Sequence, residues 1–123
     1  MIGNSLVDVM FGGLGDDTML ANAGNDELHG GFGKDKLTGH AGRDKLYGDD
    51  GNNVLSGNEG NDVLRGGNQN DNLDGGENND ELFGENGNDS HNGGTGTDVC
   101  TGGNGFDLFL GIIGVGPTCE TIN

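Results

Sequence analysis

The chain has 123 residues, 29 of them glycine, a formal net charge of −16 and an apolar fraction of only 29%. This length allows one domain at most. Ordering a residue costs roughly 1–2 kcal/mol, which so small an apolar content does not offset. An excess of 21 acidic over five basic side chains disfavours a nucleic-acid partner, and no apolar run is long enough for a membrane span. The chain is therefore either unfolded or stabilised by an external component, for which cations are the obvious candidates.

Residues 1–15 contain neither a basic segment nor a continuous apolar core, so no signal peptide is predicted there. The chain is then either a domain of a longer protein or one whose export signal lies elsewhere. A nine-residue repeat already begins at Gly3, and no separate cap precedes it. We expect this open N-terminal edge to pair with an upstream domain or with another copy of the chain.

The repeat continues through nearly the whole chain. From Gly3 to Gly111, glycine recurs at every ninth residue, with Ala21 as the single exception. If each nonapeptide is numbered from this residue, position four is also mostly glycine, and position six holds eleven of the fifteen aspartates. The position-six residues are Asp8, Asp17, Asp26, Asp35, Asp44, Asn53, Asp62, Asp71, Asp80, Asp89, Asp98 and Asp107. Position eight holds Met10, Met19, Leu28, Leu37, Leu46, Leu55, Leu64, Leu73, Leu82, His91, Cys100 and Phe109.

The nonapeptide at residues 30–38, GGFGKDKLT, shows the complete pattern GGxGxDxUx, in which U is a large apolar residue. Twelve copies in register resemble the RTX (repeats-in-toxin) calcium-binding repeats, and the resemblance extends from Gly3 to about Leu110. It implies an all-β fold, a right-handed parallel β-roll that holds Ca²⁺ ions between its turns. Proteins with this repeat include secreted enzymes, toxins and adhesins, so the resemblance also implies a secreted or cell-surface location.

The spacing of the repeat predicts how the coils are built. An apolar position eight between two polar residues predicts a three-residue strand with its central side chain inward, preceded by a six-residue glycine-rich turn. Strands this short are viable only when coils stack. Two nonapeptides per coil give about six coils, with position eight as a thin core of two columns. We expect a β-roll at residues 3–110 and a C-terminal cap at residues 111–123.

Stacking also explains the need for a metal ion. It brings position-six aspartates that are eighteen residues apart next to one another, where bare carboxylates would repel. Ca²⁺ relieves this repulsion because it accepts roughly six to eight carboxylate and carbonyl oxygens in flexible geometry. Mg²⁺ requires a near-ideal octahedron, and soft metals prefer thiolate or imidazole ligands. Five gaps on each side allow at most ten ions, and eight would neutralise the charge of −16.

The RTX resemblance implies that the ligands are the position-six side chains and backbone carbonyls of the glycine-rich turns. The candidate carbonyls are those of Gly12, Gly13, Gly15, Gly30, Gly31, Gly33, Gly48, Gly51, Gly66, Gly67, Gly84, Gly87, Gly102, Gly103 and Gly105. Asn53 removes one charge from each of the two gaps that it shares with Asp35 and Asp71. We expect the Asp8 turn, where Leu6 replaces the position-four glycine, to be the poorest site.

The repeat ends after Leu110, and two cysteines lie near this end. Cys119 follows the inward-facing Cys100 by nineteen residues, one coil plus one residue, so stacking would bring the two within reach of a disulfide. We predict a Cys100–Cys119 bridge that pins the C-terminal cap, which implies an oxidising compartment. Two free buried thiols are the alternative.

No Ser/His/Asp or Cys/His constellation is present, so neither catalytic residues nor an enzymatic activity are predicted. His91 stands where a leucine belongs, and a local defect in the core explains it better than a metal or catalytic role. The sequence favours a structural module whose folding depends on Ca²⁺. The alternative is a surface-recognition roll, ice-binding or adhesive, because Asn52, Asn70 and Asn88 stack at one outward turn position, although a regular threonine ladder is missing.

Overall fold

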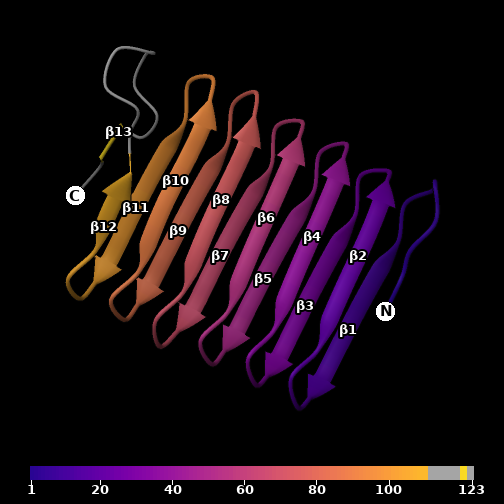
Figure 1. Cartoon of the computed structure of the whole chain (residues 1–123), viewed down its shortest axis with the longest axis horizontal. Coiled ribbons are helices and arrows are strands. Elements are labelled where there is room, and N and C mark those ends of the chain that lie inside the picture. The colour runs from indigo at the N-terminus through magenta and orange to yellow at the C-terminus, as the bar shows by residue number, and fades with distance from the viewer. Residues whose placement is uncertain (111–119, 122–123) are drawn as a thin grey trace.

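Strands and short turns alternate along the chain and wind into a flattened stack of coils (Figure 1). The structure, a computed structural model, describes residues 1–110 and 120–121. Within them no helix is long and apolar enough to cross a membrane. The strands are β1 (Val9–Leu14), β2 (Thr18–Ala23), β3 (Glu27–Phe32), β4 (Lys36–Ala41), β5 (Lys45–Asp50), β6 (Val54–Glu59), β7 (Val63–Asn68), β8 (Asn72–Glu77), β9 (Glu81–Asn86), β10 (Ser90–Thr95), β11 (Val99–Asn104), β12 (Leu108–Leu110) and β13 (Glu120–Thr121).

The strands form two parallel sheets. The odd sheet has the order β1-β3-β5-β7-β9-β11-β13, and the even sheet has the order β12-β10-β8-β6-β4-β2. From β1 to β12, each strand pairs with the strand one coil later in a register of eighteen residues, as in Leu28↔Leu46 and Leu37↔Leu55. The predicted parallel β-roll of about six two-strand coils is therefore confirmed.

The strands are longer than the three residues that the sequence pattern suggests. β1 to β11 each have six residues, from position seven of one repeat to position three of the next, so only positions four to six form the turn. The alternation of inward and outward residues continues past position eight, so that position one of the next repeat also points inward and belongs to the same strand. A Cβ on Gly30 would lie 2.6 Å from both Asp35 Oδ2 and the Gly48 carbonyl oxygen, so this position has almost no room for a side chain. An inward apolar residue followed two positions later by glycine is the sequence signal for the longer strand.

Position eight forms the core, as predicted. Met19 and all seven leucines of this column are fully buried, and Met10 is 7% exposed. Each contributes roughly 1.5–3 kcal/mol by burial. His91 is also fully buried, its ring stacks on Phe109 with centroids 5.0 Å apart, and neither ring nitrogen has a hydrogen-bond partner among the described residues. Burial lowers the pKa of His91. The histidine thus interrupts the apolar column.

Two positions of each repeat have a left-handed backbone. Position four has a positive φ in every turn from Gly15 onward, including Gln69 at 72° and Asn78 at 80°. Position two has a positive φ as well, although non-glycine residues such as His40 and Glu85 occupy it in several repeats. Glycine at position two in six of the twelve repeats, as in the pattern GGxGxDxUx, is the sequence signal for this second left-handed position.

Gln69 and Asn78 loosen the turns that precede them by one coil. At position four a Cβ usually has no space; on Gly42, for example, it would overlap the position-four carbonyl of the coil before. In five turns the position-four N–H donates to the position-three carbonyl of the next coil over 2.8–3.0 Å. The same bond is 3.2 Å at Gly51 and 3.3 Å at Gly60, which lie one coil before Gln69 and Asn78. The two larger side chains therefore stretch the stack locally.

The two ends of the roll differ from its middle. At the N-terminus, β1 is the terminal strand of the odd sheet, and Leu6, Val7 and Leu14 are 69–83% exposed. The two partners expected for this end, an upstream domain and another copy, stay predictions. At the C-terminus, β13 pairs with β11 through Cys100↔Thr121. Cys119 and most of the predicted cap lie outside the described residues, so the Cys100–Cys119 disulfide also stays a prediction.

Candidate metal centre

The position-six residues form two rows, one at each end of the strands. Turns after the odd strands carry the Asn53 row, and turns before them carry the Asp62 row; these are the lower and upper rows of turns in Figure 1. The Asn53 row contains Asp17, Asp35, Asn53, Asp71, Asp89 and Asp107. The Asp62 row contains Asp8, Asp26, Asp44, Asp62, Asp80 and Asp98. Each row places one such residue in each coil, so five gaps separate its members.

One side-chain hydrogen bond crosses every gap. The backbone N–H of each position-six residue donates to Oδ1 of the position-six residue one coil later, over 2.7–3.0 Å. The Asp44 N–H, for example, donates to Asp62 Oδ1 at 2.8 Å. This ladder fixes the orientation of each carboxylate and engages one of its two oxygens. The predicted aspartate columns are therefore brought together as stacked rows.

The second carboxylate oxygen, Oδ2, is buried and has no hydrogen-bond partner at nine positions. These positions are Asp17, Asp26, Asp35, Asp44, Asp62, Asp71, Asp80, Asp89 and Asp98. All of them except Asp17 are at most 3% exposed. A buried ionised oxygen without a partner is strongly unfavourable. The rows therefore require a cation or a proton at these oxygens.

At several turns the unpartnered oxygen shares its space with a backbone carbonyl of the next coil. Asp35 Oδ2 and the Gly48 carbonyl oxygen both lie 2.6 Å from the point where a Cβ on Gly30 would stand. In the Asp62 row, Asp62 Oδ2 and the Gly75 carbonyl oxygen converge in the same way. A carboxylate oxygen and a carbonyl oxygen from successive coils are hard ligands of the kind that Ca²⁺ prefers.

Burial also changes the titration of these carboxyl groups. Desolvation raises the pKa of Asp62, Asp71 and Asp80 to about 7, in spite of the backbone hydrogen bond that each accepts. Nearby carboxylates act in the same direction, and Asp44 raises the pKa of Asp62 further. Charging the rows at neutral pH is therefore costly unless positive charge is supplied from outside the chain.

The ligand chemistry fits calcium better than a transition metal. Among the described residues, no group of three or more His, Cys, Asp or Glu side chains is arranged to hold a metal ion. A cation between two coils would depend on backbone carbonyls for most of its ligands. Ca²⁺ accepts such ligands readily, whereas zinc sites are built from Cys, His and carboxylate side chains.

Comparison with known protein families agrees with this chemistry. The chain matches the RTX calcium-binding nonapeptide repeat (four copies) over residues 2–37, 21–55, 29–64, 56–90 and 74–109. The chain belongs to this RTX repeat family. No curated protein matches it. RTX repeats bind Ca²⁺, RTX β-rolls are typically non-catalytic structural modules, and RTX repeat proteins are typically secreted.

The carbonyl ligands expected from the sequence cover only one of the two rows. Every glycine named for this role belongs to a strand end or turn of the Asn53 row. The equivalent glycines of the Asp62 row, among them Gly24, Gly42, Gly60 and Gly75, occupy the same repeat positions but are not among those named. The nine-residue period itself is the signal that finds them. Which of these carbonyls bind an RTX calcium ion stays a prediction.

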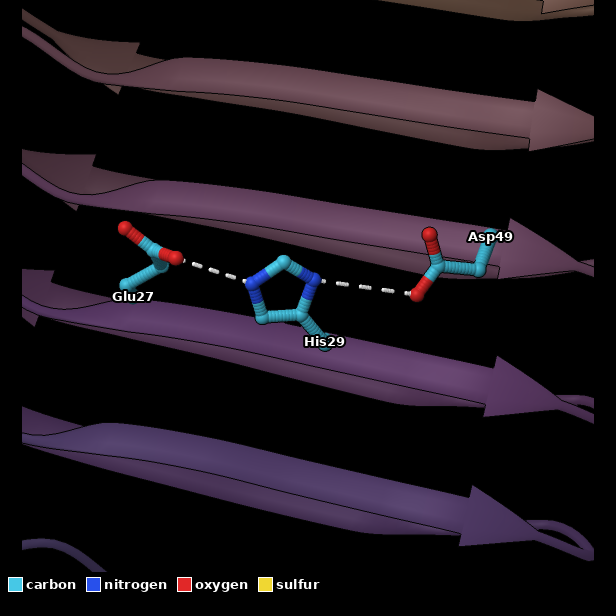
Figure 2. Close-up of polar contacts among 3 residues, drawn as sticks. All are labelled: Glu27, His29 and Asp49. Carbon is cyan, nitrogen blue, oxygen red and sulfur yellow. Dashed lines mark hydrogen bonds and ion pairs between the residues drawn. The ribbon is translucent and has the colours of Figure 1, made fainter.

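The outer face of the odd sheet carries a stack of side chains that the repeat pattern does not indicate. The His29 ring lies between Phe11 and Tyr47, with centroid distances of 4.9 and 4.6 Å and nearly parallel planes. Figure 2 shows its two nitrogens facing opposite ways, Nε2 3.0 Å from Glu27 Oε1 and Nδ1 3.9 Å from Asp49 Oδ2. Such ring pairs contribute about 0.5–1.5 kcal/mol each. The stack strengthens the contacts between successive coils. Its polar atoms do not converge on a single point as metal ligands do.

Proposed function

We propose that the chain is a structural module that folds when Ca²⁺ ions bind between successive turns. The observation that carries the proposal is the set of nine buried aspartate oxygens without a partner. In this proposal the carboxylates and the carbonyls of the turns hold the ions, and the glycines allow successive coils to approach one another. Because no such site exists in the unfolded chain, the free energy of binding becomes free energy of folding.

Titration of the chain with CaCl₂, followed by far-UV circular dichroism and isothermal calorimetry, tests this proposal. We expect the spectrum of a disordered chain in chelator and that of a β protein after Ca²⁺ is added. Mg²⁺ at the same concentration is the control, and it should not fold the chain because it retains its waters and an octahedral shell. A complete β spectrum in chelator at pH 8, where the aspartates are ionised, would contradict the proposed dependence on metal.

We also propose a non-catalytic role outside the cell. The negative charge and high glycine content favour an unfolded chain at low cytosolic Ca²⁺ and a folded one after export. The midpoint of the Ca²⁺ titration is then expected at about 10⁻⁴–10⁻³ M, the range of extracellular calcium modules. A midpoint below about 10⁻⁶ M would remove this switch, because the chain would already fold in the range of cytosolic calcium sensors.

For the C-terminal end we propose that residues 111–123 cap the last coil and that a Cys100–Cys119 disulfide fixes the cap. In support, Cys100 is fully buried, and its partner in the next strand, Thr121, follows Cys119 by two residues. Mass spectrometry of the protein before and after reduction is the test. We expect reduction to increase the mass by one pair of hydrogen atoms. An unchanged mass would contradict the disulfide.

Surface recognition, ice-binding or adhesive, is the second candidate function, because amides form ladders on the outside of the Asn53 row. The Asn70 N–H donates to Asn52 Oδ1 at 3.0 Å, and the Asn88 N–H donates to Asn70 Oδ1 at 2.8 Å. Beside them, Asn104 Nδ2 donates to Asn86 Oδ1 at 2.9 Å. A thermal-hysteresis measurement on the calcium-loaded protein tests the ice-binding form, and the absence of any hysteresis would exclude it.

A further inference from the structure

The ten gaps of the two rows are not equivalent. In eight of them, the position-six residue before the gap supplies a buried Oδ2 without a partner: Asp17, Asp35, Asp71 and Asp89 in the Asn53 row, and Asp26, Asp44, Asp62 and Asp80 in the Asp62 row. Asp98 has such an oxygen too, but the coil that would follow it lies beyond the described repeats. The two exceptional gaps are those that follow Asn53 and Asp8.

In the gap after Asn53, a hydrogen-bond donor occupies the position at which the other position-six residues have an acceptor. Asn53 Oδ1 accepts the Asp35 N–H at 2.9 Å, which places Nδ2 in the position of the missing Oδ2. Nδ2 donates to the Gly51 carbonyl at 3.3 Å, and it shares the space above Gly48 with the Gly66 carbonyl oxygen. The amide hydrogens thus face the carbonyl oxygens that would otherwise bind a cation. The partial positive charge of these hydrogens disfavours a cation there.

In the gap after Asp8, both carboxylate oxygens already have partners. The Asn4 backbone N–H donates to Asp8 Oδ2 at 2.8 Å, and Asn4 Nδ2 donates to Asp8 Oδ1 at 2.9 Å. Leu6 occupies position four of this turn and, unlike every later residue at that position, does not have a positive φ. An asparagine therefore takes the place of the ion at this gap as well, here from within the same turn.

We infer that the ten gaps between the described coils hold eight Ca²⁺ ions and that asparagine amides close the two remaining gaps without metal. The inference rests on the proposed function. Eight divalent ions carry a charge equal and opposite to the formal charge of −16. The sequence-based expectation is that Asn53 weakens both of the gaps beside it. In the structure the gap before Asn53 keeps Asp35 Oδ2 and the Gly48 carbonyl, so only the gap after Asn53 changes.

The substitution Asn53→Asp tests the inference because it restores the second carboxylate oxygen that every other position-six residue has. Asn52→Asp is the matched control, since it adds the same charge one residue away on an outward side chain. Asp16 already occupies that column and accepts the Lys34 N–H at 2.8 Å, so an aspartate there fits the fold. Bound calcium per chain is measured by equilibrium dialysis with metal analysis, and circular dichroism shows that each variant is folded.

We expect eight ions in the unchanged chain and in N52D, and nine in N53D, with a lower calcium midpoint for folding of N53D than of N52D. Ten ions in the unchanged chain, the same count in N53D, or an equal gain in N52D would each overturn the inference. If the unchanged chain binds no calcium at all, the proposed function fails first. The count therefore separates failure of the inference from failure of the function.

Discussion

The two rows of turns arise from one nonapeptide and differ mainly in continuity. From Asp26 to Asp98, every residue of the Asp62 row is a buried aspartate with an unpartnered Oδ2. The Asn53 row is divided by one amide. The backbone ladder passes through Asn53 unchanged, with bonds of 2.9 and 2.8 Å on its two sides. The difference shows that the hydrogen-bond ladder uses Oδ1 of the position-six side chain, whereas the candidate metal site uses the second terminal atom. A metal site can therefore be lost at one coil without loss of the fold.

Acidification of the metal-free chain should have the largest effect. Burial raises the pKa of Asp62, Asp71 and Asp80 to about 7, whereas an unfolded aspartate titrates near ~4. A group whose folded pKa is raised favours folding while it is protonated. Its contribution is complete below the unfolded pKa and is lost as the pH rises through the folded one. In chelator we therefore expect β structure to increase from pH 8 to pH 4, measured by circular dichroism.

Two of these three carboxyl groups belong to the Asp62 row. The double variant D62N/D80N should flatten the pH dependence more than D71N does, since it removes two of the raised groups and not one. A metal-free chain that stays disordered at every pH would show that protons do not replace the cations.

Asp62→Asn should have the next largest effect, because it copies the interruption of the Asn53 row into the continuous row. We expect the loss of one bound ion and a fall in the free energy of unfolding of roughly 3–5 kcal/mol in Ca²⁺, the cost of breaking a buried ion pair. Urea unfolding at fixed calcium measures it. Asp16→Asn is the control: its side chain is exposed, and the expected change is within about 0.5 kcal/mol. Equal effects of D62N and D16N would contradict a special role for the row.

The sequence predicts the fold well because the repeat makes every residue of a column equivalent. A period of nine and an apolar position eight are sufficient to give the coil, the eighteen-residue register and the core, as Leu28↔Leu46 illustrates. The position-six column likewise identifies the candidate sites. These features depend on residue type and spacing alone, which a single sequence displays directly.

Other features depend on the orientation of individual atoms, and these the sequence does not display. Which oxygen of Asp62 is engaged is decided by the N–H of Asp44 one coil away, and the direction of the Asn53 amide is decided by Asp35. The stack around His29 arises only after residues eighteen apart have been placed side by side.

Gly42→Ala tests how closely successive turns of the Asp62 row must approach. Gly42 has φ of 136°, and a Cβ there would overlap the carbonyl of Gly24. Gly13 is the matched control, with φ of 98° and no atom within 4 Å of its added Cβ. We expect G42A to lower the free energy of unfolding by about 3 kcal/mol and G13A by about 1 kcal/mol, since the control carries backbone strain without the clash. Equal losses in thermal unfolding would mean that the close approach does not limit the stack.

The smallest effects should come from restoring glycine at position four, once in each row. Gln69 lies in the Asn53 row and Asn78 in the Asp62 row, and both have a positive φ. Asparagine tolerates that conformation better than glutamine does. Asn78 also accepts the Gly60 N–H through its side chain at 3.2 Å, which partly compensates for the stretched backbone bond of the same N–H.

We therefore expect Gln69→Gly to raise the free energy of unfolding by roughly 0.5–1 kcal/mol, after allowance for the greater freedom of glycine in the unfolded chain. Asn78→Gly should give a smaller gain or none, because it also removes the side-chain acceptor. Thermal unfolding of both variants at saturating calcium provides the comparison. A larger gain for N78G would show that backbone strain in the Asp62 row, and not in the Asn53 row, limits the stability of the stack.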